Sequence, residues 1–310
     1  MYHIIWHKNP DTDAICATLV AAEYFRLMGQ EATPYRLGVL NKETEFVLKN
    51  IGIEPPELIS KLPEGSEIVL VDHNASIQSI DGLEQYKVKS IIDHHSIEKL
   101  STAEPMQLRF EPICSTCSVL FLMFAEQELD MSDQIAKLIL AGILSDSLAF
   151  RSPTTTEEDR EIVEYLADDL GIADIQSYAK AMFDAKSDLG DMSVRKILEL
   201  DYKMFTIGDK KFGYGVMETT SPEYAMKRKN EIIADMSALK KESQLDWIFF
   251  SVIDILAEKN VTLVAGESEE KILVAVFGCD IKDWMASLWN RLSRKKELEP
   301  ALRKYLETIA

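Results

Sequence analysis

The stretch His7-Lys8-Asn9-Pro10-Asp11-Thr12-Asp13 separates a short apolar run, residues 4–6, from an apolar segment that begins at residue 14. The first run is typical of the end of a β-strand and the second of a helix, so the stretch is predicted to be a strand-to-helix turn. Pro10 cannot continue a strand ladder and stiffens such a turn. In an open α/β sheet this turn lies at the carboxyl edge, where ligands bind. Asp11 or Thr12 could simply cap the helix, but one cap does not require a histidine and two aspartates.

Length and composition are those of an ordinary soluble globular protein. The 310 residues, 46% of them hydrophobic and 28% charged, allow two domains with a substantial core. No apolar run approaches the ~18 residues of a membrane helix, and we expect no signal peptide. The four cysteines form no disulfide framework, which favours a reducing cytoplasm. The formal net charge of −18 argues against non-specific nucleic-acid binding, and any phosphate site must bring its own positive charge.

Residues 1–186 alternate between short strand-like runs and helical runs. Strands are expected near residues 2–6, 33–37, 67–71, 89–92 and 106–110, and helices near residues 13–28, 44–50, 116–128, 132–144, 156–170 and 174–183. This alternation predicts an α/β fold with a parallel, doubly wound sheet and helices on both faces.

The polar stretch of residues 186–191 interrupts this rhythm. We place a linker at residues 187–193, between an N-terminal domain of residues 1–186 and a smaller C-terminal domain of residues 194–310. The second domain should contain strands near residues 205–207, 212–217, 247–253, 261–265 and 272–277, a long helix at 221–241 and a short terminal helix. Ser221 is expected to cap the long helix, with Pro222 at its first position. Because no helix is expected between the last two strands, we predict a mixed sheet.

The histidines gather at the ends of predicted strands. Of five in the chain, four belong to three motifs that also contain carboxylates: His7 to Asp13, Asp72-His73-Asn74 and Asp93-His94-His95. Each motif alone could be a helix cap or a turn histidine. If the strands are parallel neighbours, however, the motifs converge on one edge, and Asp146 can join them from the end of a helical run.

Such a convergence favours a metal centre. Imidazole and carboxylate without thiolate suit Mn²⁺, Fe²⁺, Co²⁺ or Zn²⁺. Two divalent ions ~3.5–4 Å apart would relieve the repulsion between the carboxylates and deprotonate a water for attack at phosphorus.

Two further patterns have competing interpretations. The run Ser293-Arg294-Lys295-Lys296 is more typical of a solvated helix end, although Arg294 could bind an oxyanion; Lys203 has the pattern of a surface lysine. The segment Cys114-Ser115-Thr116-Cys117 lacks the second pair that zinc requires and the context of a thioredoxin. We expect Ser115 or Thr116 to cap a helix whose N-terminus could point donors at an anion.

The three strand-end motifs resemble those of the DHH phosphoesterase superfamily. Together with the stretch Ile143-Leu144-Ser145-Asp146-Ser147 and the run Ser293-Arg294-Lys295-Lys296, they make the chain most similar to the family II, manganese-dependent inorganic pyrophosphatases, over almost its whole length. The resemblance implies a cytoplasmic hydrolase that converts pyrophosphate to two orthophosphates with a hydroxide bridging two divalent ions. It also implies two Mn²⁺ ions, with Co²⁺ as an alternative, additional Mg²⁺ that arrives with the substrate, and a homodimer formed through the N-terminal domain.

Carried over onto this sequence, the resemblance implies a role for each matched residue. One metal would be held by His7, Asp11 and Asp72, and the other by Asp13, Asp72, His94 and Asp146, with Asp72 bridging. His95 would contact the substrate, and the phosphates would be bound from the second domain by Lys203, Arg294 and Lys295. Glu297 departs from the glutamine that often follows the basic run in this family.

Three other functions compete with this hypothesis. An exopolyphosphatase of the same superfamily would share the metal site, but a polymeric substrate favours a longer basic channel. A nucleic-acid or dinucleotide phosphoesterase of the superfamily usually carries a Gly-rich, His-containing motif in its second domain, and no Gly-Gly occurs in this chain. A metal- or nucleotide-sensing protein on a degenerate scaffold should have lost ligands, whereas every matched ligand position is filled.

Overall fold

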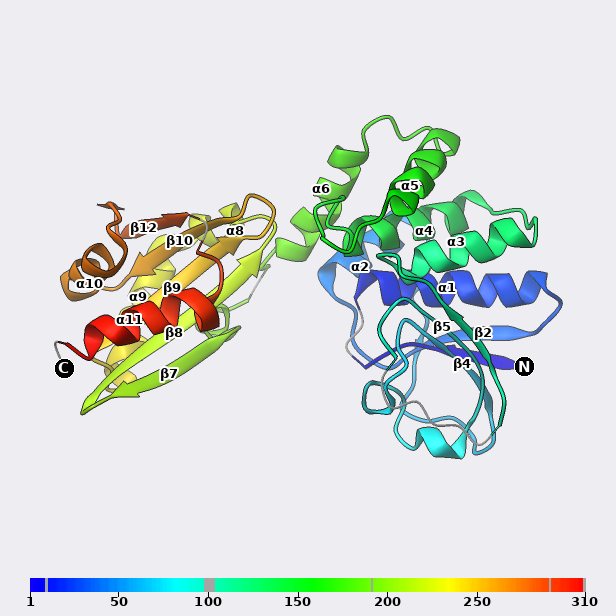
Figure 1. Cartoon of the computed structure of the whole chain (residues 1–310), viewed down its shortest axis with the longest axis horizontal. Coiled ribbons are helices and arrows are strands. Elements are labelled where there is room, and N and C mark those ends of the chain that lie inside the picture. Colours follow the sequence, from blue (N-terminus) through cyan, green and yellow to red (C-terminus); the bar gives the residue numbers. More distant parts are fainter. Residues whose placement is uncertain (9–10, 98–103, 191, 290, 309–310) are drawn as a thin grey trace. The chain divides into compact units, whose positions relative to one another are not determined.

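The computed structural model divides into two compact units, Met1–Lys186 and Ser187–Ala310, each with its own sheet and its own core (Figure 1). It describes residues 1–8, 11–97, 104–190, 192–289 and 291–308, without the side chains of Lys295 and Lys296. Pro10, which was expected to stiffen the first turn, therefore lies outside the described residues. Within these ranges, no helix has the length and apolar character needed to cross a membrane.

Unit 1 is built on a six-stranded parallel sheet with the order β3-β2-β1-β4-β5-β6. The strands are β1 (Tyr2–Ile5), β2 (Ala32–Arg36), β3 (Glu57–Leu58), β4 (Glu67–Val71), β5 (Lys87–Asp93) and β6 (Gln107–Phe110). The chain moves outward from β1 to β3, returns to β4 beside β1, and moves outward in the other direction. This order confirms the predicted doubly wound parallel sheet. The short strand β3 lies where the sequence indicated only a loop.

The α-helices of unit 1 lie on one side of this sheet (Figure 1). They are α1 (Thr12–Leu27), α2 (Lys42–Ile51), α3 (Thr116–Glu126), α4 (Asp133–Asp146), α5 (Glu157–Asp169) and α6 (Ile175–Ser187). Helices α1 and α3 contact strands, α4 packs on α1 and α3, and α5 packs on α4. Small residues of α1, such as Ala17 and Ala21, are completely buried. The opposite face carries loops and two 3₁₀ helices, η1 (Ser76–Gln78) and η2 (Leu83–Gln85), over an apolar cluster that includes Ile68 and Ile80. These elements are shorter than the α-helices expected on the second face.

Unit 2 contains a mixed sheet with the order β11-β12-β10-β9-β8-β7. The strands are β7 (Tyr202–Ile207), β8 (Lys210–Thr219), β9 (Trp247–Asp254), β10 (Lys259–Val264), β11 (Ile281–Lys282) and β12 (Met285–Trp289). Strands β8 and β9 are parallel and the other neighbours antiparallel, which confirms the predicted mixed sheet.

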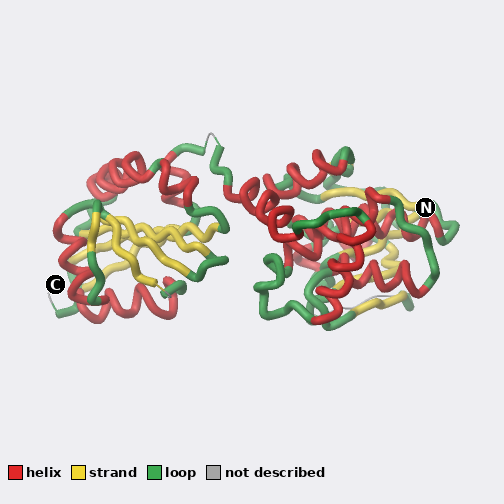
Figure 2. The backbone as a smooth tube through the Cα atoms, turned by 90° about the horizontal axis from the view of Figure 1, so that it is seen from above, coloured by secondary structure: helices red, strands yellow, loops and turns green. Residues whose placement is uncertain are grey.

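Helices cover both faces of the second sheet (Figure 2). They are α7 (Val194–Glu199), α8 (Glu223–Lys227), α9 (Lys229–Glu242), α10 (Glu267–Phe277) and α11 (Glu299–Leu306), with a π-helical turn η3 (Arg294–Leu298). Successive residues of a strand point to opposite faces: Phe249 packs into the cluster under α10 and α11, and Phe250 into the cluster under α7 and α9.

Three predictions for unit 2 were wrong. Residues 272–277 form the end of helix α10 and not a strand. Three glutamates in the first turn favour the helix dipole, and Gly278 ends the helix with φ 63°. The expected helix at 221–241 is divided into α8 and α9 by Arg228, which has φ −102° and ψ 13°. The N-cap residue of α8 is Pro222 and not the predicted Ser221, and Pro222 supplies no side-chain hydrogen bond.

Candidate active site

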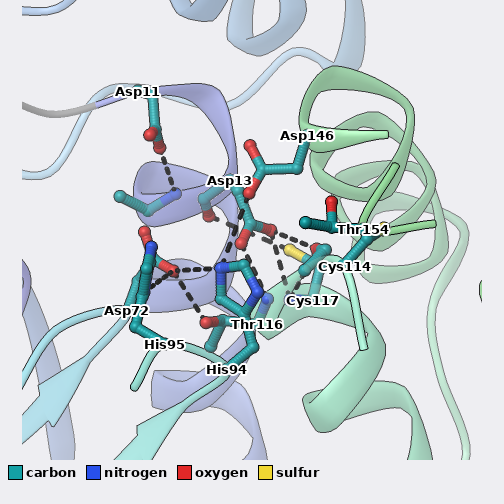
Figure 3. Close-up of polar contacts among 12 residues, drawn as sticks. Asp11, Asp13, Asp72, His94, His95, Cys114, Thr116, Cys117, Asp146 and Thr154 are labelled. Atoms are coloured by element: carbon teal, nitrogen blue, oxygen red, sulfur yellow. Dashed lines mark hydrogen bonds and ion pairs between the residues drawn. The ribbon is translucent and has the colours of Figure 1, made fainter. Parts of the chain in front are cut away.

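Strand ends and helix ends bring the predicted metal residues together at one edge of the unit 1 sheet (Figure 3). His7 follows β1, Asp72 follows β4, and His94 and His95 follow β5. These three strands are parallel neighbours, so their carboxyl ends meet. Asp11 caps α1 by accepting a hydrogen bond from Ala14 N (3.0 Å), Asp13 lies in the first turn of α1, and Asp146 is the last residue of α4. Asp11 therefore caps α1, as one interpretation of the first motif predicted, and this role is compatible with a place in the cluster.

The ligand atoms form three overlapping groups, in each of which the atoms lie within 4.8 Å of one another. The groups are His7, Asp11 and Asp72; Asp13, His94 and Asp146; and Asp72, His94 and His95. The distance from His7 Nε2 to Asp72 Oδ2 is 3.5 Å, and the distance from His94 Nε2 to Asp72 Oδ1 is also 3.5 Å. Asp72 thus presents one oxygen to each histidine, which is how a carboxylate bridges two cations.

His94 is oriented as metal-binding histidines usually are. Its Nδ1 lies 3.0 Å from the carbonyl oxygen of Ile113 and donates to it, so Nε2 carries the lone pair. This Nε2 is buried and has no hydrogen-bond partner among the described residues. It faces Asp72 Oδ1 and, at 3.7 Å, Asp146 Oδ2. A lone pair that faces two carboxylates is stable only with a cation or a proton between them.

The pKa values of the aspartates in the cluster also indicate that a cation or protons are needed there. Burial, followed by the charges of Asp13, Asp11 and Asp146, raises the pKa of Asp72 well above its usual value, although Thr116 Oγ1 donates a hydrogen bond to it (2.7 Å). Burial and the charges of Asp13 and Asp11 also raise the pKa of Asp146, and the charge of Lys186 opposes the shift. A divalent cation reverses such shifts. The residues present therefore fit a centre for Mn²⁺ or a similar ion.

The backbone at Asp72 has an uncommon conformation. Its φ of 62° lies in the left-handed region, which aspartate tolerates better than most residues, and its N–H still donates to Ile92 O (2.9 Å). The next residue, His73, is buried, and its Nδ1 donates to Val71 O (2.9 Å). Burial lowers the pKa of His73 to about 4, so it is neutral, and its ring packs edge-on against His7.

The N-terminus of helix α3 holds the carboxylate of Asp13. Ser115 Oγ donates to Asp13 Oδ1 (2.6 Å), Thr116 N to Oδ2 (2.8 Å) and Cys117 N to Oδ1 (3.1 Å) (Figure 3). Ser115 also caps α3, as predicted, and the anion at this helix end is the side chain of Asp13. Burial raises the pKa of the Cys114 and Cys117 thiols, so these free cysteines are unreactive.

Asp93 organises the two histidines that follow it. Its Oδ1 accepts hydrogen bonds from His94 N (2.8 Å), His95 N (3.1 Å) and His95 Nδ1 (2.8 Å), and its Oδ2 accepts one from Asn74 Nδ2 (2.7 Å). Burial opposes the ionised form, but the hydrogen bonds outweigh it and lower the pKa of Asp93. The same bond to Asp93 raises the pKa of His95. The His95 ring is about half exposed and therefore accessible to a substrate.

Arg294 and Lys203 lie in the same part of unit 2. Arg294 lines a pocket of about 450 Å³ with Asp201, Glu218 and Glu297. Its side chain is 9% exposed, and its guanidinium donates to Asp201 Oδ1 (2.7 Å) and to the carbonyl oxygen of Tyr214 (3.3 Å). Tyr214 pairs in register with Lys203, which is exposed on β7.

The structure describes the side chain of Glu297, which follows the basic run, but not that of Lys295 within the run. Glu297 Oε2 accepts hydrogen bonds from Leu292 N (3.0 Å) and Ser293 N (2.9 Å). The predicted phosphate ligand Lys295 has a side chain outside the described part of the structure. The Asp201–Arg294 ion pair was not expected from the sequence, because the two residues are far apart in the chain.

Two family models and several named proteins match the chain over nearly its whole length. Residues 2–143 match the DHH family N-terminal domain, and residues 180–305 match the DHHA2 domain. A Deinococcus radiodurans protein named manganese-dependent inorganic pyrophosphatase is 46% identical over 309 residues, which is 98% of each chain. A Bacillus licheniformis protein of the same name is 37% identical over 305 residues, again 98% of each chain.

Solved structures show the same relationship. A crystal structure described as a family II inorganic pyrophosphatase of Methanococcus jannaschii has a TM-score of 0.64 and 34% identity, and the match covers 98% of this chain and 99% of that chain. An exopolyphosphatase-related protein from Bacteroides fragilis has a TM-score of 0.50 and 16% identity over 98% of this chain and 92% of that chain, which indicates a shared fold alone.

Proposed function

Because the chain belongs to the family of manganese-dependent inorganic pyrophosphatases, we propose that the carboxylate–imidazole cluster of unit 1 is its active site. The protein is a hydrolase that converts inorganic pyrophosphate to two orthophosphates and depends on manganese. The observation that carries the assignment of the site is the buried carboxylate of Asp72, which offers one oxygen towards His7 and the other towards His94.

The proposed site would hold two Mn²⁺ ions. His7, Asp11 and Asp72 would hold one, and Asp13, His94 and Asp146 would hold the other, with Asp72 as a shared ligand. Co²⁺ can replace Mn²⁺ because both accept imidazole and carboxylate ligands, and additional Mg²⁺ enters with the phosphate oxygens of the substrate. When bound, a pair of divalent ions lowers the pKa of a water molecule and so supplies the nucleophile.

The protein's own side chains bind and orient the substrate. His95, whose protonated form is favoured by its hydrogen bond to Asp93, donates from its exposed ring to a phosphate oxygen. Arg294, Lys203 and Lys295 neutralise phosphate charge from unit 2 and stabilise the leaving phosphate. We therefore assign residues 1–186 as the metal-binding catalytic domain, 187–193 as the linker and 194–310 as the substrate-binding domain. With a net charge of −18, we expect no nucleic-acid partner, and we propose a cytoplasmic location.

One assay tests the substrate. Phosphate release is measured from pyrophosphate, tripolyphosphate, long-chain polyphosphate and a dinucleotide, each with Mn²⁺ and with Mg²⁺. Pyrophosphate with Mn²⁺ should be hydrolysed fastest. A faster rate on long-chain polyphosphate would instead assign the chain as an exopolyphosphatase, the alternative that shares this metal site.

Replacing Arg294 with alanine should raise the KM for pyrophosphate by roughly 10–100-fold, the loss of one charge-assisted hydrogen bond. Manganese content should be unchanged because the proposed ligands all lie in unit 1. The matched control is Arg303→Ala, which removes a surface arginine of α11 paired with Glu299 (2.6 Å). Equal KM values in wild type and Arg294→Ala would exclude the arginine from the substrate site.

We also propose a homodimer formed through unit 1. Strand β6 is an edge of the sheet, with unpaired backbone groups that a second copy can bond, and Leu108 on it is 51% exposed. Light scattering should give twice the chain mass of 35.1 kDa, and Leu108→Glu should shift the protein towards the monomer. The control Ile77→Glu alters an exposed apolar residue of η1 and should leave the dimer intact. A monomeric wild type would contradict the proposal.

A further inference from the structure

Lys186, the last residue of unit 1, forms an ion pair with an entirely buried glutamate. Its Nζ lies 3.0 Å from Glu43 Oε2, and Glu43 lies in the first turn of α2 with no exposed surface. Among the described residues, no donor makes a hydrogen bond of good geometry to either oxygen of Glu43. The Lys186 side chain, by contrast, is 43% exposed. One side chain of the pair is thus fully buried, while the other is partly exposed.

This pair is linked through a neighbouring residue to the segment that carries two proposed metal ligands. Thr44, which follows Glu43, has its Oγ1 3.1 Å from Thr12 Oγ1, and Thr12 stands between Asp11 and Asp13 in the chain. Burial opposes the charged form of Lys186, but Glu43, Asp11 and Asp146 favour it, and the pKa of Lys186 is raised. Asp11 and Asp146, one from each proposed metal site, are therefore among the charges that act on this ammonium group.

A cationic side chain on the metal-binding unit would add to the attraction that divalent ions exert on an anionic substrate. The proposed ligands from this unit are carboxylates and imidazoles, which carry no permanent positive charge. An ammonium group has three donors, and the single contact with Glu43 leaves donors available to another oxygen.

We propose that Lys186 is a phosphate-binding residue supplied by the metal-binding unit. Its ammonium group donates to an oxygen of pyrophosphate, while Glu43 holds it at the border of the carboxylate cluster. The inference rests on the active site proposed above and adds a substrate contact to it. The sequence pattern does not indicate this role, because Lys186 begins the polar stretch that resembles a linker.

The test compares Lys186→Met with Lys180→Met. Lys180 lies on the same helix and pairs with Asp184 at 2.7 Å, so its variant controls for loss of a lysine from α6. Lys186→Met should raise the KM for pyrophosphate about tenfold or more, with unchanged manganese content. The dissociation constant for methylenediphosphonate, a pyrophosphate analogue that is not hydrolysed, should rise by a similar factor. Lys180→Met should match wild type, and an unchanged KM in Lys186→Met would overturn the proposal.

A double variant separates substrate binding from a purely structural role. Lys186→Met alone leaves a buried, unpaired carboxylate, and Glu43→Gln removes that charge. If the lysine only neutralises Glu43, Glu43→Gln with Lys186→Met should have the wild-type KM, and that result would overturn the proposal. If Lys186 binds phosphate, the KM stays raised in the double variant. Either result leaves the proposed function standing, because that function fails only if the wild-type protein does not hydrolyse pyrophosphate.

Discussion

Asp72→Asn should lose manganese binding and at least about 10³-fold in pyrophosphatase activity, because Asp72 is the one proposed ligand shared by both metal sites. Asparagine is the appropriate replacement because it tolerates the left-handed backbone at this position (φ 62°). Its amide can still accept the hydrogen bond that Thr116 Oγ1 donates to Asp72. The substitution therefore removes charge with little change of shape. Metal content by elemental analysis and phosphate release by a colorimetric assay give the two readouts.

The same variant should stabilise the metal-free protein. In that form the pKa of Asp72 is raised above its unfolded value, chiefly by burial and by the charges of Asp13 and Asp11. The folded state then binds more protons than the unfolded state, so the free energy of unfolding falls as the pH rises above the unfolded pKa. Lowering the pH from 7 towards 5 should therefore stabilise metal-free wild type through Asp72, against the opposite contribution of buried His73, and Asp72→Asn should lack the Asp72 contribution in urea denaturation.

Asp81→Asn is the matched control. Asp81 is exposed and pairs with Lys8 on the surface, where an ion pair contributes little to stability. This variant should retain metal, activity and the pH dependence of wild type. If Asp72→Asn kept its manganese and its activity, the assignment of the bridging carboxylate would be wrong.

Gly142→Ala should destabilise the protein by roughly 1–3 kcal/mol, the usual effect of overpacking a core. A methyl group at Gly142, in the middle of α4, would overlap the sulfur of Cys117 and lie 2.7 Å from Asp13 Oδ1. In an unobstructed helix the same change raises the free energy of unfolding by about 1 kcal/mol. At Gly142 it is expected to lower the free energy of unfolding. Urea denaturation of the metal-free protein measures the effect.

The same substitution should also weaken manganese binding. Asp13 is held by three donors from the start of α3, and the added methyl group must displace its carboxylate. Manganese affinity should fall roughly 10–100-fold, as when the support of a ligand is disturbed. Competition with a chelator measures this affinity.

A second substitution separates the two effects. Cys117→Ala combined with Gly142→Ala relieves the overlap with sulfur but not the one with Asp13, so stability should recover in part while manganese affinity stays low. Lys137→Ala, on a partly exposed position of the same helix, should behave as wild type. A stability gain of about 1 kcal/mol in Gly142→Ala, the ordinary helix effect, would show that the close packing at this glycine is not restrictive.

Much of unit 1 follows from local sequence patterns. Apolar runs of strand length define β1, β4 and β5, and each is followed directly or nearly so by a motif of histidine and carboxylate. Parallel strands place such motifs on one edge without further information. The capping preference of Ser115 locates the start of α3 in the same way. These features depend on residues close together in the chain, and for that reason they can be predicted from the sequence.

Local patterns did not decide the secondary structure where a strand and a helix would show the same pattern. The apolar run at residues 272–277 is compatible with either a strand or a buried helix, because such a short run does not distinguish the two periods. Its helical form depends on the acidic first turn of α10 and on Gly278. The break at Arg228 likewise has no glycine or proline to mark it. There Arg228 Nη1 donates to the carbonyl oxygen of Met192 (2.6 Å), a contact made across the fold.

The sequence by itself determined the family, the parallel sheet and the identity of the proposed metal residues, because each depends on residue types at strand and helix ends. Only the tertiary structure decided how those residues are supported. The helix α3 donors that hold Asp13, the pairing of Asp201 with Arg294, the space that requires Gly142 and the position of Lys186 beside Glu43 all join residues far apart in the chain. Packing places those residues together, and no local pattern records it.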